Sequence, residues 1–215
     1  MSEPVQRGKF VTLEGTEGSG KSTNLAAMLA CLDKHQVPYI QTREPGGTPL
    51  AEELRELLLS PREEAVDAKA ELLMVFAARA QHIEGVIKPA LARGEWVVSD
   101  RFTDATYAYQ GGGRGLPLAL IESLESLVQE GLQPDCTILL DLDPAVGLER
   151  ALNRGDLDRF ESEKMEFFEN VRRAYLARAK ADSSRFHIVD AAQSVAQVSA
   201  AVVAALEVLI AEGTP

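Results

Sequence analysis

Cysteine and histidine are scarce in this sequence, whose 215 residues include two cysteines and three histidines. Cys31 and Cys136 stand far apart within apolar segments, and the histidines show no spacing that would complete a set of metal ligands. Isolated cysteines of this kind are typically buried free thiols. We therefore expect no metal centre made of cysteine and histidine.

Long hydrophobic runs are also lacking. The sequence has no stretch of 18 or more apolar residues, so a membrane-spanning helix is not predicted. Residues 1–8 do not follow the basic-then-apolar order of a secretory signal. We therefore expect a cytoplasmic protein with no membrane partner.

Basic side chains are outnumbered, with 22 lysines and arginines against 33 acidic residues and a formal net charge of -11. Proteins bind nucleic-acid polymers through many lysine and arginine contacts with phosphate, so this composition argues against a nucleic-acid partner. A small anion can still bind where a few arginines converge.

Short apolar segments alternate with amphipathic ones through the whole chain, without a repeat, low-complexity tract or linker. Continuous apolar runs predict strands at 9–13, 39–42, 96–99, 137–140 and 186–189. Helical spacing of apolar residues predicts helices at 21–35, 71–92, 117–130, 144–154, 165–181 and 195–211. This alternation indicates an α/β fold, a doubly wound parallel five-stranded sheet flanked by helices, in one domain over 1–215.

A glycine-rich segment directly follows the first expected strand and matches G-x-x-x-x-G-K-[ST] in full. With the next residue it consists of Gly15, Thr16, Glu17, Gly18, Ser19, Gly20, Lys21, Ser22 and Thr23. Glycines let successive N–H groups point at phosphate oxygens, and the following helix adds the positive end of its dipole. Lys21 can reach the β- and γ-phosphates and Ser22 can ligate magnesium, so the segment predicts a nucleoside triphosphate site.

Four classes of P-loop protein share that segment: a GTPase switch, an ATP-driven motor, a small-molecule kinase and a nucleotide-binding regulator without chemistry. The N-K-x-D pattern of guanine recognition is absent. Asp141 ends the fourth expected strand, but Leu142 follows it where a motor usually has a second acidic residue. Asp141 can instead hydrogen-bond a nearby backbone group.

Arginines follow two of the expected strands. Arg43 comes after 39–42, and Arg101 comes after 96–99 and Asp100. The carboxyl ends of parallel strands lie at one edge of the sheet, so both guanidinium groups are expected beside the P-loop, where an acceptor phosphate would lie. Arginine donates two hydrogen bonds to one phosphate, and this second anion site favours a small-molecule kinase.

The sequence resembles bacterial thymidylate kinase from the first expected strand to the last helix. The matching segments are 14–23, 43–48, 100–102, 108–115 and 150–160. The Arg-Glu-Pro-Gly-Gly-Thr and Tyr-Gln-Gly-Gly motifs are specific to that family among P-loop kinases. The resemblance implies a P-loop nucleoside monophosphate kinase fold that moves the γ-phosphoryl group of ATP to thymidine monophosphate in dTTP biosynthesis. It also implies magnesium as cofactor and a homodimer.

The resemblance assigns an acceptor site. Its implied members are Glu14, Arg43, Phe76, Arg79, Arg101, Thr106, Tyr109 and Gln110. Glu14 is implied to contact the sugar 3′-hydroxyl, Phe76 to stack on the base, and Arg79 to bond a thymine carbonyl. Tyr109 is implied to crowd the sugar 2′ carbon. Ala105 is a departure, because relatives often carry serine there.

The resemblance also implies which residues act on ATP. The lid is expected near 150–160, and its Arg150 and Arg154, spaced to share a helix face, are expected to serve the transferring phosphoryl group. The residues implied to be catalytic are Lys21, Arg101, Arg150, Arg154 and Glu14. Those implied to bind magnesium are Ser22 and Asp100, and those implied to pass the adenine are Ala192 and Gln193. A kinase for another small acceptor and a regulator without chemistry stay open as alternatives.

Overall fold

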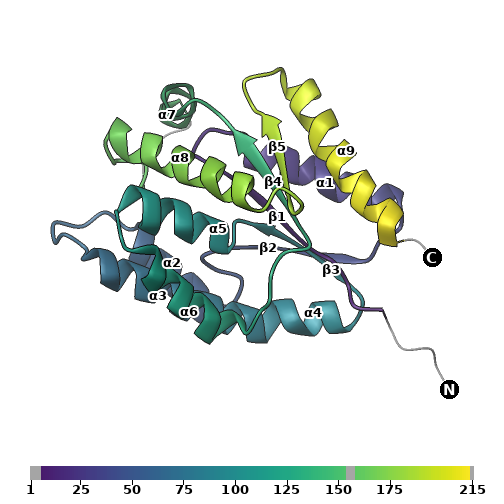
Figure 1. The fold of residues 1–215 in the computed structure, drawn as a ribbon, viewed down its shortest axis with the longest axis horizontal. Helices are drawn as coiled ribbons and strands as arrows, with labels where there is room; N and C mark the ends of the chain where they lie inside the picture. The colour runs from purple at the N-terminus through teal and green to yellow at the C-terminus, as the bar shows by residue number, and fades with distance from the viewer. Residues whose placement is uncertain (1–5, 154–157, 214–215) are drawn as a thin grey trace.

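The structure is a computed structural model that describes residues 6–153 and 158–213. Within these residues, five parallel strands form one sheet in the order β2-β3-β1-β4-β5 (Figure 1). The strands are β1 (Phe10–Gly15), β2 (Tyr39–Arg43), β3 (Trp96–Asp100), β4 (Cys136–Asp141) and β5 (Phe186–Asp190). The five expected strands and the doubly wound fold are confirmed, with β1 between β3 and β4.

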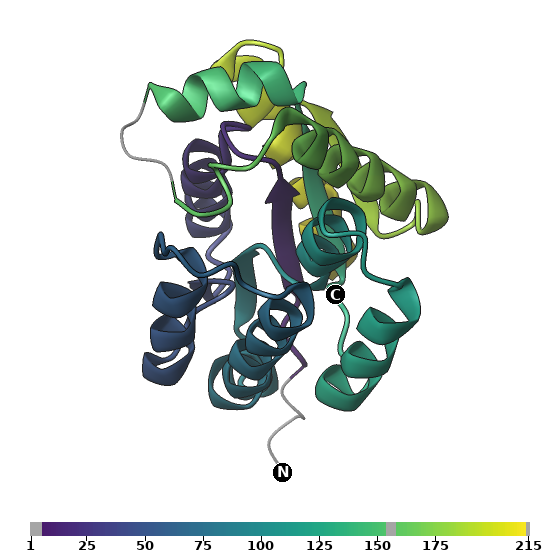
Figure 2. The ribbon, with the colours of Figure 1, turned by 90° about the vertical axis from the view of Figure 1, so that its left-hand side faces the viewer.

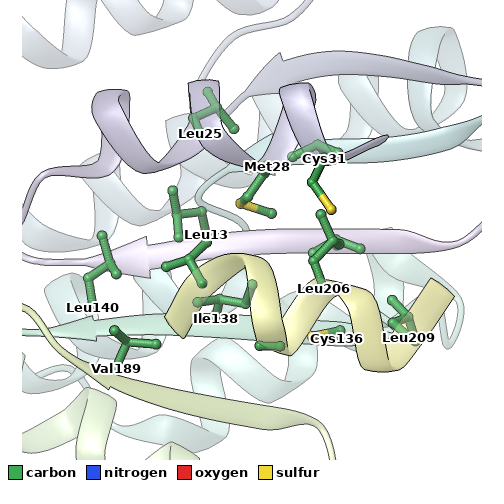
Figure 3. Packing of buried hydrophobic residues seen from close by; sticks show 14 of the residues in the cluster. Leu13, Leu25, Met28, Cys31, Cys136, Ile138, Leu140, Val189, Leu206 and Leu209 are labelled. Atoms are coloured by element: carbon green, nitrogen blue, oxygen red, sulfur yellow. The ribbon is translucent and has the colours of Figure 1, made fainter. Parts of the chain in front are cut away.

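Both faces of β1 are covered, because successive strand residues point to opposite sides of a sheet. Leu13 packs with α1 (Lys21–Lys34) and α9 (Val195–Gly213). Figure 3 shows this cluster between the two helices and the strands. Phe10 packs on the opposite face, against α4 (Lys88–Ala92). Burial on both faces explains why the strands read as continuous apolar runs rather than alternating ones.

The other expected helices are present with shifted ends. They are α6 (Leu118–Gln129), α7 (Pro144–Leu152) and α8 (Met165–Ala181). The single helix expected over 71–92 is instead α3 (Ala68–His82), the π-helical turn η1 (Ile83–Ile87) and α4. Helix α3 begins at Ala68, three residues before the expected start, because the Asp67 side chain caps it by accepting hydrogen bonds from N–H groups of the first turn.

The sequence patterns did not predict α2 (Pro49–Leu59) or the pair α5 (Thr103–Thr106) and η2 (Tyr107–Gly113). Thr48 caps α2 by accepting a hydrogen bond from the next turn. The glycines of η2 permit close packing on α8, since a Cβ on Gly113 would lie 2.4 Å from the Phe167 ring. All three elements border the carboxyl edge of the sheet.

By length and composition, α9 could cross a membrane, with a mean hydropathy of 1.8 over Val195–Glu212. The criterion of an unbroken apolar run did not reveal it, because serine and glutamine interrupt the segment. In the fold, Val198, Val202 and Leu206 of this helix are buried in the cluster with α1. One face of α9 thus packs against the rest of the fold beside α1 (Figure 1), although only 22% of the Val195–Glu212 window is buried.

Candidate active site

A cavity of about 520 Å³ lies at the carboxyl ends of β1, β2 and β3. The P-loop lines one end of it, and residues of α2, α3 and η2 line the other. Figure 2 shows α7 lying above the carboxyl end of β1. The cavity thus joins an anion-binding loop to a second pocket, as the doubly wound topology leads one to expect.

Lys21 occupies the P-loop end of the cavity. Its Nζ donates hydrogen bonds to Gly15 O and Thr16 O, both at 3.0 Å. Burial, and then the nearby Arg101 guanidinium, lower the pKa of Lys21 to about 8. Gly20 precedes α1 in the left-handed conformation and provides no side-chain cap, so the first N–H groups of the helix remain available to an anion.

The backbone of α7 packs directly on the P-loop. A Cβ on Gly18 would lie 2.1 Å from Gly147 O, so a side chain at residue 18 would prevent the P-loop and α7 from packing this closely. Arg150, one turn further along α7, lines the cavity, and its Nη1 lies 3.4 Å from Gly18 O and from Ala191 O. Arg150 therefore stands where expected, whereas Arg154 lies outside the described residues.

Three arginines meet where the acceptor phosphate is expected. Arg43 and Arg101 both line the cavity, together with Arg55 of α2. Burial, followed by the positive charges of Arg43 and Arg101, lowers the pKa of Arg55. Arg101 has a φ of 72°, an unusual backbone conformation that persists at functional sites when surrounding contacts hold it. Its Nη2 donates to Glu17 Oε1 at 3.0 Å. Such a cluster of cations suits a multiply charged anion.

Arg79 stands at the far end of the cavity and is 2% exposed. Its Nε donates to Glu44 Oε2 at 2.7 Å, and its Nη2 donates to Thr106 Oγ1 at 2.9 Å. Its Nη1 is buried without a hydrogen-bond partner among the described residues. A buried donor without a partner is costly, so this N–H is well placed to bond a ligand carbonyl.

The expected stacking role of Phe76 is wrong. Phe76 does not line the cavity; it packs in a cluster with Leu72, Tyr107 and Ile121. Val75, the preceding residue of α3, lines the cavity instead. Adjacent helix residues point about 100° apart, and here Val75 faces the cavity while Phe76 faces the apolar cluster. This part of the cavity therefore has an aliphatic wall where an aromatic one was expected.

The expected sugar contact of Glu14 is also wrong. Its carboxylate is wholly buried, where Oε1 accepts from Phe102 N and Oε2 from Tyr175 OH, both at 2.7 Å. Burial, followed by the neighbouring charge of Asp104, raises its pKa to about 8. Glu17 lines the cavity in its place.

Glu17 has one occupied and one free carboxylate oxygen. Its Oε1 accepts a hydrogen bond from Tyr109 OH at 2.6 Å in addition to the one from Arg101. Its Oε2 is buried and has no hydrogen-bond partner in the described part of the chain. The free oxygen can accept a ligand hydroxyl, which is the role that the sequence had suggested for Glu14.

The structure brings most other expected residues together. Those that also line the cavity are Ser22, Thr23, Asp100, Thr106, Tyr109 and Gln110. Ala192 and Gln193 are exposed and lie outside it, where Asp190 accepts hydrogen bonds from both. Ala105, the noted departure, also faces the cavity.

Sequence reasoning did not assign Arg55 or Leu58 to the site and placed Phe160 only within the expected lid, yet all three line the cavity. Arg55 and Leu58 belong to α2, whose start was signalled by Thr48 and the following proline. No comparable signal marks Phe160, because only the folded chain brings its ring to Tyr109, with 5.9 Å between the ring centroids.

Asp141 and the two cysteines lie outside this cavity. Asp141 binds Arg172 through both carboxylate oxygens, at 2.7 and 2.9 Å, so it serves an ion pair rather than a backbone group. Both cysteines are buried and free, as expected. The ligand atoms of Cys31, His35 and Glu207 lie within 4.8 Å of one another, but Lys34 Nζ already supplies a positive charge 3.6 Å from the Glu207 carboxylate.

Comparisons with known proteins by sequence and by structure lead to the same family. A family model described as thymidylate kinase matches residues 13–202. The thymidylate kinase of Teredinibacter turnerae is 62% identical over 203 residues, covering 94% of this chain and 99% of that protein. That of Hahella chejuensis is 56% identical over 207 residues, covering 96% and 100%. A solved thymidylate kinase from Ehrlichia chaffeensis has a TM-score of 0.74 and 31% identity, over 95% of this chain and 99% of that one. This chain belongs to the thymidylate kinase family.

Proposed function

We propose that the cavity holds ATP and dTMP at the same time and is where the phosphoryl group is transferred. Thymidylate kinases, this chain among them, move the γ-phosphoryl group of ATP to dTMP and release dTDP and ADP. One observation carries the assignment to this cavity. The cavity extends from the P-loop lysine, Lys21, to Arg79, whose buried Nη1 has no partner among the described residues.

The P-loop holds the donor phosphates. The N–H groups at the start of α1 and the Lys21 ammonium face them, and Lys21 exchanges its bonds to loop carbonyls for bonds to phosphate oxygens. Arg150 reaches the same region from α7 and supplies positive charge to the transferring group. Phosphoryl transfer needs positioning and charge neutralisation, and the acceptor oxygen is already anionic, so no general base is required.

Ser22 and Asp100 fit a magnesium ion. Both line the cavity, and Asp100 Oδ1 is buried with no hydrogen-bond partner among the described residues. Hydroxyl and carboxylate oxygens are ligands that magnesium accepts, directly or through water. Bound magnesium neutralises charge on the donor phosphates.

The arginine cluster and Glu17 orient the acceptor. Arg43, Arg55 and Arg101 face its phosphate, and Glu17 Oε2 accepts a hydrogen bond from a sugar hydroxyl. Tyr109 stands beside Glu17 and limits the room around the sugar. Arg150 of α7 and the segment with Phe160 line the cavity, and their cover helps to keep water from the transferring group.

The assignment is tested by ADP release from purified protein with ATP, magnesium and each nucleoside monophosphate in turn. We expect release with dTMP far above that with cytidine or purine monophosphates. ADP release that does not depend on the acceptor contradicts the proposal. So does ADP release that occurs with none of the nucleoside monophosphates but does occur with an acceptor that is not a nucleotide. The first outcome is that of an ATPase, and the second that of a kinase for another small molecule. A regulator without chemistry releases no ADP at all.

We also propose a homodimer formed through α2 and α3, in the cytoplasm. Leu57 on α2 and Leu73 on α3 are 51% and 57% exposed on two helices that pack together. Burying such side chains between two copies contributes favourable free energy. Light scattering after size-exclusion chromatography tests this. Leu73→Glu is expected to give a monomer, whereas Val208→Glu on α9 is expected to leave the dimer intact. A dimer in the first variant contradicts this interface.

A further inference from the structure

Glu71, in the first turn of α3, has a fully buried carboxylate on which three segments converge. Its Oε1 accepts hydrogen bonds from Gln110 Nε2 at 2.9 Å and from Arg114 Nε at 3.2 Å. Its Oε2 lies 2.7 Å from Arg159 Nη2. Two guanidinium groups thus balance a carboxylate that has no contact with solvent, so the position of the carboxylate is strongly constrained.

That carboxylate fixes the orientation of the Gln110 amide. An amide side chain donates at its nitrogen and accepts at its oxygen, whereas a carboxylate only accepts. Because Glu71 Oε1 receives the hydrogen bond, the nitrogen of Gln110 must point to Glu71. Gln110 lines the cavity and is 3% exposed, so its carbonyl oxygen is the end left to face a ligand.

The cavity therefore presents a donor and an acceptor to the base. Arg79 offers its unpartnered Nη1–H, and Gln110 offers its Oε1. A thymine ring carries a carbonyl oxygen beside a ring N–H, which matches this order. Cytosine carries an amino donor beside an unprotonated ring nitrogen, so donor would face donor and acceptor would face acceptor.

We infer that Glu71 is a specificity-determining positioning residue, which makes the pocket select bases that carry a carbonyl beside a ring N–H. It does so by holding Gln110 in one of its two amide orientations. Without the carboxylate, the amide can rotate by 180° and offer a donor to the base. This inference rests on the proposed function, because it concerns the acceptor pocket of the same reaction.

Glu71 also holds part of the cavity wall through Arg159. Arg159 Nε donates to Leu58 O at 2.7 Å, and the next residue, Phe160, places its ring 4.5 Å from the Arg159 guanidinium carbon and lines the cavity. A change at residue 71 therefore loosens this wall as well as freeing the amide. The ratio of kcat/KM for two acceptors separates the two effects. A looser wall weakens the binding of both acceptors and leaves their ratio unchanged, whereas a freed amide changes the ratio.

The experiment compares kcat/KM for dTMP and dCMP in wild type, Glu71→Gln, Gln110→Met and the double variant. In Glu71→Gln, the residue-71 amide can both donate and accept, so it no longer dictates the orientation of Gln110. We expect the dTMP:dCMP ratio to fall about tenfold, the factor set by one hydrogen bond. Gln110→Met is expected to lower the ratio similarly, and Glu71→Gln to add no further loss in that background.

Glu163→Gln is the matched control. Glu163 accepts a hydrogen bond from the other side of Arg114, so this variant removes an ion pair from the same network without touching Gln110. It is expected to keep the wild-type ratio. Should Glu71→Gln unfold, Glu71→Asp keeps the charge for the arginines but draws the carboxylate away from Gln110, and the same fall in ratio is expected.

A wild-type ratio in the folded residue-71 variant overturns the inference, as does an equal fall in the Glu163 control. Additive losses in the double variant overturn it too, because they show that Glu71 acts without Gln110. Failure of wild type to phosphorylate dTMP is a separate result that overturns the proposed function itself.

Discussion

Glu17 Oε1 and Arg101 Nη2 lie 3.0 Å apart, in an ion pair that joins the P-loop to the carboxyl end of β3. The second carboxylate oxygen of Glu17, Oε2, is buried and has no hydrogen-bond partner among the described residues. The same guanidinium also accounts for part of the lowered pKa of Lys21. Arg101 thus contacts Glu17 and also influences the P-loop lysine.

Glu17→Gln is expected to lower kcat/KM for dTMP by about tenfold or more, because a charged acceptor for the sugar hydroxyl is lost. The measurement is steady-state kinetics with dTMP and with its 3′-deoxy analogue. The variant and wild type should differ little with the analogue, which has no 3′-hydroxyl to bind. Equal losses with both acceptors would show that Glu17 acts only by holding Arg101.

Glu14→Gln is expected to keep turnover near the wild-type rate and to change how stability depends on pH. The pKa of Glu14 is raised from 4.5 to about 8 in the folded protein. Folding therefore takes up a proton between these values, so the stability from this group is complete below 4.5 and is lost as pH rises through 8. A neutral glutamine removes that dependence.

Thermal unfolding from pH 5 to pH 8.5 tests this expectation. Glu14→Gln should gain stability relative to wild type as the pH rises. Glu53→Gln, which changes an exposed carboxylate of α2, is the control and should follow wild type throughout. A difference that stays constant with pH contradicts the assignment, and a large loss of turnover restores Glu14 to the catalytic site.

Local patterns predicted the strands and the P-loop, because continuous burial and glycine spacing are properties of short segments. They could not decide between neighbours. Whether Val75 or Phe76 faces the cavity depends on the rotation of α3, which the packing of Phe76 against Tyr107 and Ile121 sets. That packing joins residues distant in sequence, so the stacking residue was misassigned.

Glu14 and Glu17 also show that local patterns cannot decide which of two nearby residues faces the cavity. Glu14 ends β1 and Glu17 lies within the P-loop, so both are near the expected acceptor. Gly15, with a φ of 144°, redirects the chain between them. Only the folded position of Tyr175, which arrives from α8, shows that Glu14 is satisfied internally. Helix α2 was missed for a different reason, because Thr48 and Pro49 are a recognisable helix start in the sequence that was not used.

ATP affinity is expected to depend on pH through Lys21. Its pKa in the substrate-free protein is about 8, because of burial and then Arg101. Phosphates bind the charged ammonium, so the affinity contributed by this group is full below pH 8 and falls above it, by up to tenfold per pH unit. Calorimetry at pH 8.5 in buffers of different ionisation enthalpy should reveal that ATP binding takes up a proton.

Lys21→Met serves as the reference for that experiment, because it has no ammonium to protonate. It should bind ATP more weakly and take up no proton from this source. Uptake equal to that of wild type would assign the proton to another group, and would contradict the lowered pKa of Lys21.

Arg150→Ala is expected to lower kcat roughly 1,000-fold while changing dTMP affinity little. The P-loop carries no arginine, so the charge that develops during transfer must be met from outside it. Arg150 Nη1, 3.4 Å from Gly18 O, stands beside the phosphate cradle and away from the Arg79 end of the cavity. An arginine acting on the transferring group is typically worth this much in rate, because it stabilises the transition state more than the ground state.

Steady-state rates and calorimetric dTMP affinity separate the two possible roles of Arg150. Arg173→Ala, which removes an exposed arginine of α8, is the control and should change neither quantity. If Arg150→Ala weakens dTMP binding in proportion to the rate, the arginine acts on the ground state. If both variants turn over at the wild-type rate, Arg150 only braces α7 against Gly18 and Ala191, and the charge must come from another residue of the lid.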